Sequence, residues 1–275
     1  MSGARFRRKR KKRPLDQQAY ARVFRMREHP DAWGWGNKGN HQESWQVLEQ
    51  RCTDRASRIR LAHLLTRLGS SDRGAKESAL AELELAALLL RAGCSVTFLP
   101  ESQARTADLE CMLAQTRFVV EITALVGSVH SRFHGRLAQR GIGVPEGEEE
   151  GEFLIRRLLA RISQKARQLS DYTDPVVLSI TVPPRLDRDD MVDLKRLAGA
   201  LTVRLPLYGH LSAILLTLWD VHPLPSRSGV RLSNVHFVER SGRQHTHPRV
   251  RLLVMNPAAA KPLRGGELQV IRALL

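Results

Sequence analysis

Two acidic residues in an otherwise apolar part of the chain could bind a divalent metal ion. Asp108 precedes one apolar run, and Glu121 lies within a second, 117–125, which has the composition of a buried strand. The polar segment 114–116 between the runs is typical of a hairpin turn. Because an unpaired carboxylate is costly to bury, such a residue usually has a cation beside it. Two carboxylates from adjacent strands suit a hard ion such as Mg²⁺.

The segment before this hairpin is predicted to place a third acid near the pair. Residues 77–92 have the pattern of a helix, and Gly93 after them is a typical helix C-cap. This helix is apolar nearly all round, which is typical of a helix buried on several sides. Glu82 and Glu84 both flank its apolar stripe, and the helical pattern does not choose between them.

The rest of the chain favours an α/β fold in which helices alternate with strands early and hairpins come late. Residues 42–68 are predicted to be helical with a break near Thr53, and 69–78 to form a turn into the next helix. Strands are expected at 95–99, 175–182, 211–219, 230–239 and 250–255, and further helices at 16–28, 151–170 and 189–204.

The charge of the chain favours a polyanionic partner. The 275 residues include 44 Lys and Arg against 28 Asp and Glu, a formal net charge of +16. Nucleic acid is the commonest partner of so basic a protein, and the alternative is a basic protein with a solubilising tail. The cationic run 5–13 is suited to neutralise phosphates, although a localisation signal or a solvated tail has the same composition.

Several protein classes are not supported by the sequence. No apolar run approaches the ~20 residues of a membrane helix, and the basic N-terminus lacks the apolar stretch of a secretory signal. Without such segments, no contact with a membrane is expected. The three cysteines have no metal-ligand spacing, and a reducing cytoplasm is the expected location. The segment 69–78 is not a phosphate-binding loop, because Ala75 separates its second glycine from the lysine.

The order helix with an acid, glycine, strand, Asp, hairpin and Glu over roughly 77–182 resembles the PD-(D/E)xK nuclease superfamily. The resemblance implies a restriction-endonuclease-like mixed central sheet flanked by helices. It also implies an endo- or exonuclease that hydrolyses DNA with Mg²⁺, or Mn²⁺, as cofactor. By position, Asp108, Glu121 and the backbone carbonyl of Ile122 match the metal ligands, and Glu82 matches the helical acid of the resolvase-like members.

Two positions depart from the motif of this superfamily. Ala107 replaces the proline, and Thr123 replaces the lysine that helps to orient or activate water. The protein is then either a catalytically inactive relative that binds nucleic acid, or an enzyme in which another element supplies the basic group. Lys165, in the predicted helix 151–170, is the candidate for that group, and the alternative is that it is a solvated helix lysine.

Further residues are predicted to contact nucleic acid. Arg157 and Arg161 precede Lys165 at intervals of four, so the three share one helix face. Gln168 and Tyr172 fit the Gln-x-x-x-Tyr signature of the RecB-like branch of the superfamily. If the segment after the hairpin is helical, three arginines form a basic edge suited to a phosphate backbone: Arg132, Arg136 and Arg140.

The sequence therefore predicts three regions and two alternative functions. Residues 1–15 are expected to be a disordered basic arm, 16–75 a helical extension, and 76–275 the nuclease-like domain. The leading hypothesis is a metal-dependent nuclease, and the second is a binding module without catalysis. A small-molecule enzyme is disfavoured, because the chain has no cofactor fingerprint.

Overall fold

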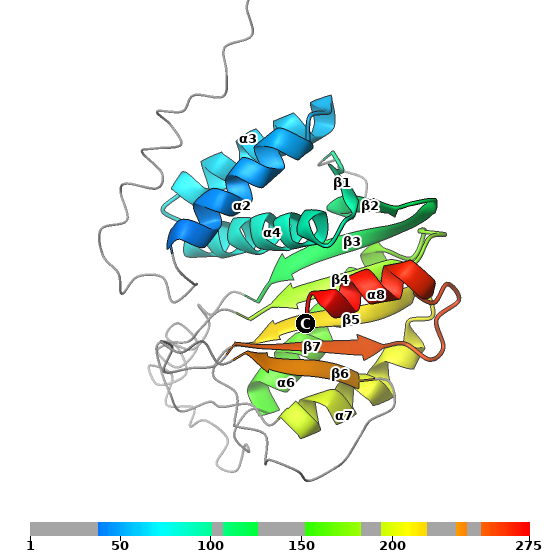
Figure 1. Cartoon of the computed structure of the whole chain (residues 1–275). Helices are drawn as coiled ribbons and strands as arrows, with labels where there is room; N and C mark the ends of the chain where they lie inside the picture. The colour runs from blue at the N-terminus through cyan, green and yellow to red at the C-terminus, as the bar shows by residue number, and fades with distance from the viewer. Residues whose placement is uncertain (1–37, 101–106, 126–151, 183–193, 219–234, 241–248) are drawn as a thin grey trace, which may run out of the picture.

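The described part of the chain contains one seven-stranded mixed sheet with helices on both faces (Figure 1). This computed structural model describes residues 38–100, 107–125, 152–182, 194–218, 235–240 and 249–275. The predicted basic arm 1–15, the predicted helix 16–28 and the three arginines 132, 136 and 140 lie outside these residues. None of the described helices is both long and apolar enough to cross a membrane.

The strands follow the order β1-β2-β3-β4-β5-β7-β6 across the sheet. Their bounds are Ser95–Phe98 for β1, Leu109–Leu113 for β2, Thr116–Ala124 for β3, Val176–Thr181 for β4, Leu211–Leu218 for β5, Val235–Arg240 for β6 and Arg249–Met255 for β7. The first three strands pair antiparallel, β3, β4 and β5 pair parallel, and β7 and β6 return antiparallel. The expectation of a mixed α/β sheet is thus confirmed.

Two sets of helices cover the two faces. One set is α2 (Lys38–Arg51), α3 (Arg55–Gly69), α4 (Arg73–Arg91) and α8 (Gly265–Ala273), and the other is α6 (Glu152–Gln168) and α7 (Leu194–Arg204), followed by the 3-10 turn η2 (Leu205–Leu207). Parallel strands need a crossover connection. In the chain, α6 lies between β3 and β4, and α7 lies between β4 and β5. Both crossover helices pack on the same face of the sheet.

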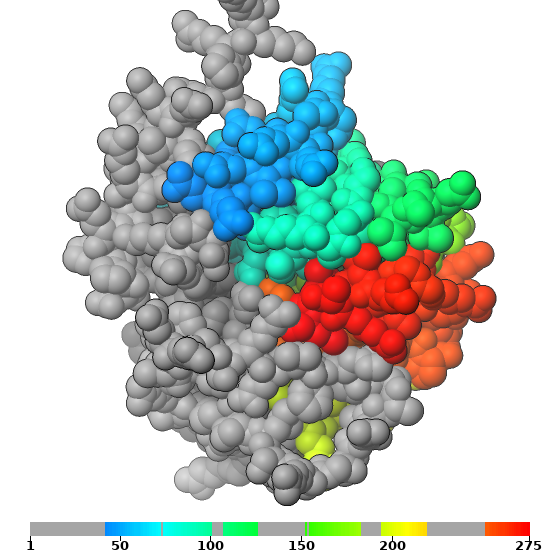
Figure 2. All heavy atoms as spheres, in the orientation of Figure 1, coloured from blue at the N-terminus to red at the C-terminus, as the bar shows by residue number. Residues whose placement is uncertain are grey.

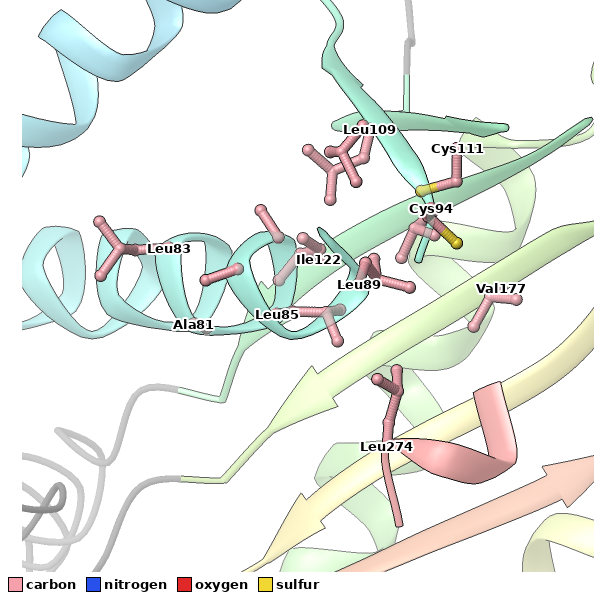
Figure 3. Packing of buried hydrophobic residues seen from close by; sticks show 14 of the residues in the cluster. Ala81, Leu83, Leu85, Leu89, Cys94, Leu109, Cys111, Ile122, Val177 and Leu274 are labelled. Atoms are coloured by element: carbon pink, nitrogen blue, oxygen red, sulfur yellow. The ribbon is translucent and has the colours of Figure 1, made fainter. Parts of the chain in front are cut away.

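Each set of helices buries its own hydrophobic cluster against the sheet. The first cluster joins leucines of α2, α3 and α4 to Phe118, Val120 and Ile122 of β3, and Figure 3 shows part of it. The second joins α6 and α7 to Val119 and to the alternate positions of β4 and β5. Because successive strand residues face opposite sides, this division places Glu121 on the side of α6.

Local sequence signals explain why the elements around the site begin and end where they do. The side chain of Asp72 accepts hydrogen bonds from the backbone N–H groups of Gly74 and Ala75, so it caps α4. The helix therefore begins within the segment predicted to be a turn. It ends before Gly93, whose φ of +95° favours glycine, as predicted. The hairpin turns at Ala114, which has a φ of 52°.

Two features of the fold were not anticipated. The C-terminal helix α8 packs Val270 and Ile271 into the first cluster, although no helix was predicted after residue 204. On the face shown in Figure 2, this C-terminal segment lies beside α4. Helices α2 and α3, predicted as an extension of the domain, also contribute to that cluster through residues such as Leu48 and Leu64.

Candidate functional site

The β2–β3 hairpin brings Asp108 and Glu121 close together. Leu109 of β2 pairs with Val120 of β3, and the N–H of Asp108 donates to the carbonyl of Val120 over 3.1 Å. Asp108 directly precedes β2, and Glu121 follows Val120 within β3. The charge of Glu121 raises the pKa of Asp108, which requires that the two carboxylates lie near each other. The two predicted metal ligands are therefore neighbours at the same end of the hairpin.

Asp108 is held by partners on both of its carboxylate oxygens. Its Oδ2 accepts a hydrogen bond from the N–H of Ile122 over 2.7 Å. Its Oδ1 accepts one from the guanidinium Nη2 of Arg60, also over 2.7 Å. The backbone of β3 and a side chain of α3 thus fix the orientation of this carboxylate.

Arg60 joins Asp108 to Glu82. Its Nη2 and Nε donate to Oε2 of Glu82 over 2.8 and 3.1 Å, and Arg67 Nη1 donates to Oε1 of Glu82 over 2.6 Å. The side chains of Arg60 and Glu82 are only 6% and 4% exposed. One buried guanidinium therefore bridges an acid of α4 and the acid that precedes β2.

The two arginines were missed by the sequence analysis, although a signal for them exists. Ser57, Arg60, Leu64 and Leu68 all lie on the buried face of α3, and Arg67 is spaced seven residues after Arg60. An arginine among the apolar positions of an amphipathic helix requires a buried anionic partner. That pattern predicts a paired acid, but it does not tell which acid in the chain is the partner.

Lys165 of α6 donates a hydrogen bond to Oε1 of Glu121. Its side chain is 19% exposed, while that of Glu121 is 5% exposed. The lysine is thus paired at the edge of the site rather than solvated on the outer face of the helix. Thr123, which the predicted resemblance places at the position of the motif lysine, is buried in β3.

Burial and mutual repulsion raise the pKa values of all three acids. The pKa of Glu82 rises to about 7, first through burial and then through the charge of Asp108, against Arg60 and Arg67. The pKa of Asp108 also rises to about 7, through burial and Glu121, against the Ile122 N–H, Arg60 and Lys165. Burial raises the pKa of Glu121, and Lys165 opposes it. The pKa of each acid is raised by the charge of another acid of the set, so the three form one electrostatic cluster.

The remaining predicted residues lie along α6 and the turn after it. The hydroxyl of Tyr172 accepts a hydrogen bond from the N–H of Ala107 over 2.7 Å, directly before Asp108. Arg161 Nη1 donates to Gln164 over 2.9 Å, and Arg157 is half-buried on the same helix. Gln168 is the last residue of α6. Tyr172 therefore contacts the backbone directly before Asp108, while contact of these residues with nucleic acid stays a prediction.

The donor atoms of the cluster suit a hard divalent cation, but Arg60 lies where such an ion would bind. Within the described ranges, no three His, Cys, Asp or Glu side chains are placed to hold a metal ion as they stand. The Arg60 Nη2 atom lies 2.7 Å from Asp108 Oδ1 and 2.8 Å from Glu82 Oε2. Carboxylate oxygens that converge on one point are the ligands that Mg²⁺ and Mn²⁺ prefer. In this structure the three carboxylates are instead paired with Arg60, Arg67 and Lys165.

Comparison with known proteins gives no assignment. No family model, no curated protein and no solved structure matches this chain. Its function must be inferred from the arrangement of its own residues.

Proposed function

We propose that the protein is a metal-dependent nuclease that hydrolyses phosphodiester bonds of DNA on a restriction-endonuclease-like sheet. The observation that carries this proposal is the convergence of Glu82, Asp108 and Glu121 from three elements, with Lys165 of a fourth in contact with Glu121. These elements follow the order α4-β1-β2-β3-α6-β4, with β3 parallel to β4. The same order is expected of the PD-(D/E)xK superfamily.

The residues have distinct roles in the proposed reaction. Asp108, Glu121 and the carbonyl of Ile122 would hold Mg²⁺ or Mn²⁺, which supplies Lewis acidity to phosphodiester hydrolysis. Glu82 would assist from α4. Lys165 is oriented by Glu121, and its ammonium group would stabilise negative charge that develops on the phosphate. Lys165 would thus take the role of the motif lysine, whose position is occupied by Thr123.

The charge of the protein supports a polyanionic substrate. The net charge of +16 favours electrostatic binding of DNA. Arg157 and Arg161 precede Lys165 on α6 at intervals of four residues, so the three basic residues share one face of this helix. In the proposal they contact the phosphate backbone together with Gln168 and with the arginines at 132, 136 and 140.

A specific observation favours the second candidate, a nucleic-acid-binding protein without catalysis. When ionised, the acids Glu82, Asp108 and Glu121 are matched in number by Arg60, Arg67 and Lys165. A cluster that is already balanced in charge does not require a metal ion for its stability. In this alternative the acids and bases maintain the fold, and only the basic surface acts on nucleic acid.

Cleavage assays separate the two candidates. The protein is incubated with supercoiled plasmid, linear duplex and single-stranded DNA in Mg²⁺, in Mn²⁺ and in EDTA. The nuclease proposal requires metal-dependent cleavage that is lost in Asp108→Asn and in Glu121→Gln. The matched control is Glu110→Gln in β2, because Glu110 pairs with Arg117 near the surface. DNA binding without cleavage in either metal would instead support the binding protein.

A further inference from the structure

Helix α3 lies outside the α4–β4 segment that carries the proposed catalytic acids, yet its Arg60 contacts two of them. The guanidinium is buried and makes three hydrogen bonds, two to Glu82 and one to Asp108. An arginine that only stabilised a helix pair would not need to reach the start of β2. This contact connects the N-terminal helices to the centre of the candidate site.

The position of Arg60 Nη2 excludes a second cation from the same oxygens. The nitrogen lies 2.7 and 2.8 Å from the two carboxylate oxygens that it bridges. An Mg²⁺ ion would approach such oxygens to about 2.1 Å and would carry two like charges into contact with the guanidinium. In a buried site with weak screening, the two cations cannot share Asp108 Oδ1.

The backbone of α3 is fastened to the sheet close to this arginine. The Oγ of Ser57, one turn before Arg60, accepts a hydrogen bond from the N–H of Phe98 in β1 over 2.9 Å. The Sγ of Cys52, before the helix, donates to the carbonyl of Val96 over 3.4 Å. These two contacts hold the start of α3 and the residue before it against β1.

We propose that Arg60 is an internal counter-ion that competes with the divalent ion for Asp108, so that α3 sets the metal affinity of the site. The inference rests on the proposed metal-dependent function. In the metal-free protein the guanidinium neutralises the buried carboxylates. Arg60 would have to leave Asp108 before an ion could bind there, and the loss of the guanidinium contacts would lower the measured affinity.

The first experiment compares Mn²⁺ binding to the wild-type protein and to Arg60→Gln by calorimetry. The variant is expected to bind Mn²⁺ at least about fivefold more tightly, the lower range of ordinary coupling between two ligands. Arg67→Gln should have a smaller effect, because Arg67 contacts only Glu82 and not Asp108. Arg58→Gln, on the exposed side of the same helix, controls for the loss of one positive charge. Equal or weaker binding by a folded Arg60→Gln would overturn the proposal.

A second measurement follows the wild-type protein itself and uses a variant only to assign one signal. The Nε–H group of Arg60 donates to Glu82, so its ¹⁵N-detected NMR signal should exchange slowly with water without metal. The signal is assigned by its loss in Arg60→Lys. Saturating Mg²⁺ is expected to shift this signal and to abolish its protection. A signal that stays protected at saturating Mg²⁺ would contradict displacement of the guanidinium.

The two measurements also distinguish failure of the inference from failure of the proposed function. If the wild-type protein binds Mn²⁺ and cleaves DNA, but Arg60→Gln binds no more tightly, only the inference is wrong. If neither protein binds Mn²⁺ at any concentration tested, the metal-dependent function and the inference both fail.

Discussion

Lys165 of α6 donates a hydrogen bond to Glu121 of β3, which lies 44 residues earlier in the chain. The contact exists because β3 and β4 are parallel, so the intervening helix packs across the face from which Glu121 projects. It places a basic group beside Glu121. The topology of the sheet thus explains how a helix that is distant in the sequence supplies a basic group to this strand.

Replacement of Lys165 by methionine is expected to lower the single-turnover rate of DNA cleavage by about 10²-fold at saturating metal, because one preorganised donor for the phosphate is removed. Lys165→Arg should retain part of the rate. Lys261→Met is the control, since Lys261 is exposed in the segment before α8. An unchanged rate in Lys165→Met would assign this lysine to charge balance alone.

Metal affinity is expected to rise with pH and to level off above about pH 7. The pKa values of Glu82 and Asp108 are both raised to about 7, so below that pH protons compete with the ion for these carboxylates. Mn²⁺ titrations between pH 5.5 and 8.5 measure the effect. The number of protons released on binding should also fall above pH 7. An affinity that is constant over this range would show that neither carboxylate takes up a proton there.

The stability of the metal-free protein should have an unusual pH dependence. The ordinary pKa values of these two acids, 3.8 for Asp108 and 4.5 for Glu82, are raised in the folded state. Between about pH 4 and 7 the folded protein therefore binds more protons than the unfolded chain, and this part of its stability falls as the pH rises. Urea denaturation in EDTA at several pH values measures the slope.

A variant isolates the contribution of one acid to that slope. Glu82→Gln removes one titrating group, so its free energy of unfolding should depend less on pH than that of the wild-type protein. Glu43→Gln is the matched control, because Glu43 is exposed and pairs with Arg91 at the surface. If the two variants have the same slope as the wild-type protein, the site does not cause the pH dependence.

Local patterns were sufficient to predict the elements that carry the acids. The polar break at 114–116 predicted the hairpin, and the hairpin brings Asp108 close to Glu121. Gly93 predicted the end of α4, because glycine readily adopts the positive φ that a helix end requires and this preference is local. Spacing along α6 gave Lys165 as a candidate, since residues four apart share a helix face.

Contacts between distant segments could not be predicted in the same way. The helical pattern did not show whether Glu82 or Glu84 is the acid of the site. In the structure Glu82 accepts a hydrogen bond from Arg60, and Glu84 accepts one from Arg251 of β7. The sign of a buried charge can be inferred from a helix, but its partner depends on how the helices are stacked. Arg60 is 48 residues from Asp108, and nothing local in the sequence connects them.

Tyr172→Phe tests whether this tyrosine positions the site or contacts DNA. The hydroxyl accepts the N–H of Ala107 next to Asp108, and its loss would leave that donor unpaired in a partly buried place. The free energy of unfolding should fall by about 1–2 kcal/mol, and Mn²⁺ affinity should fall as well, because Asp108 loses its support. DNA affinity in EDTA should stay unchanged, which fluorescence anisotropy would measure. If DNA affinity falls while metal affinity and stability do not, Tyr172 contacts the nucleic acid and the hydrogen bond to Ala107 has no positioning role.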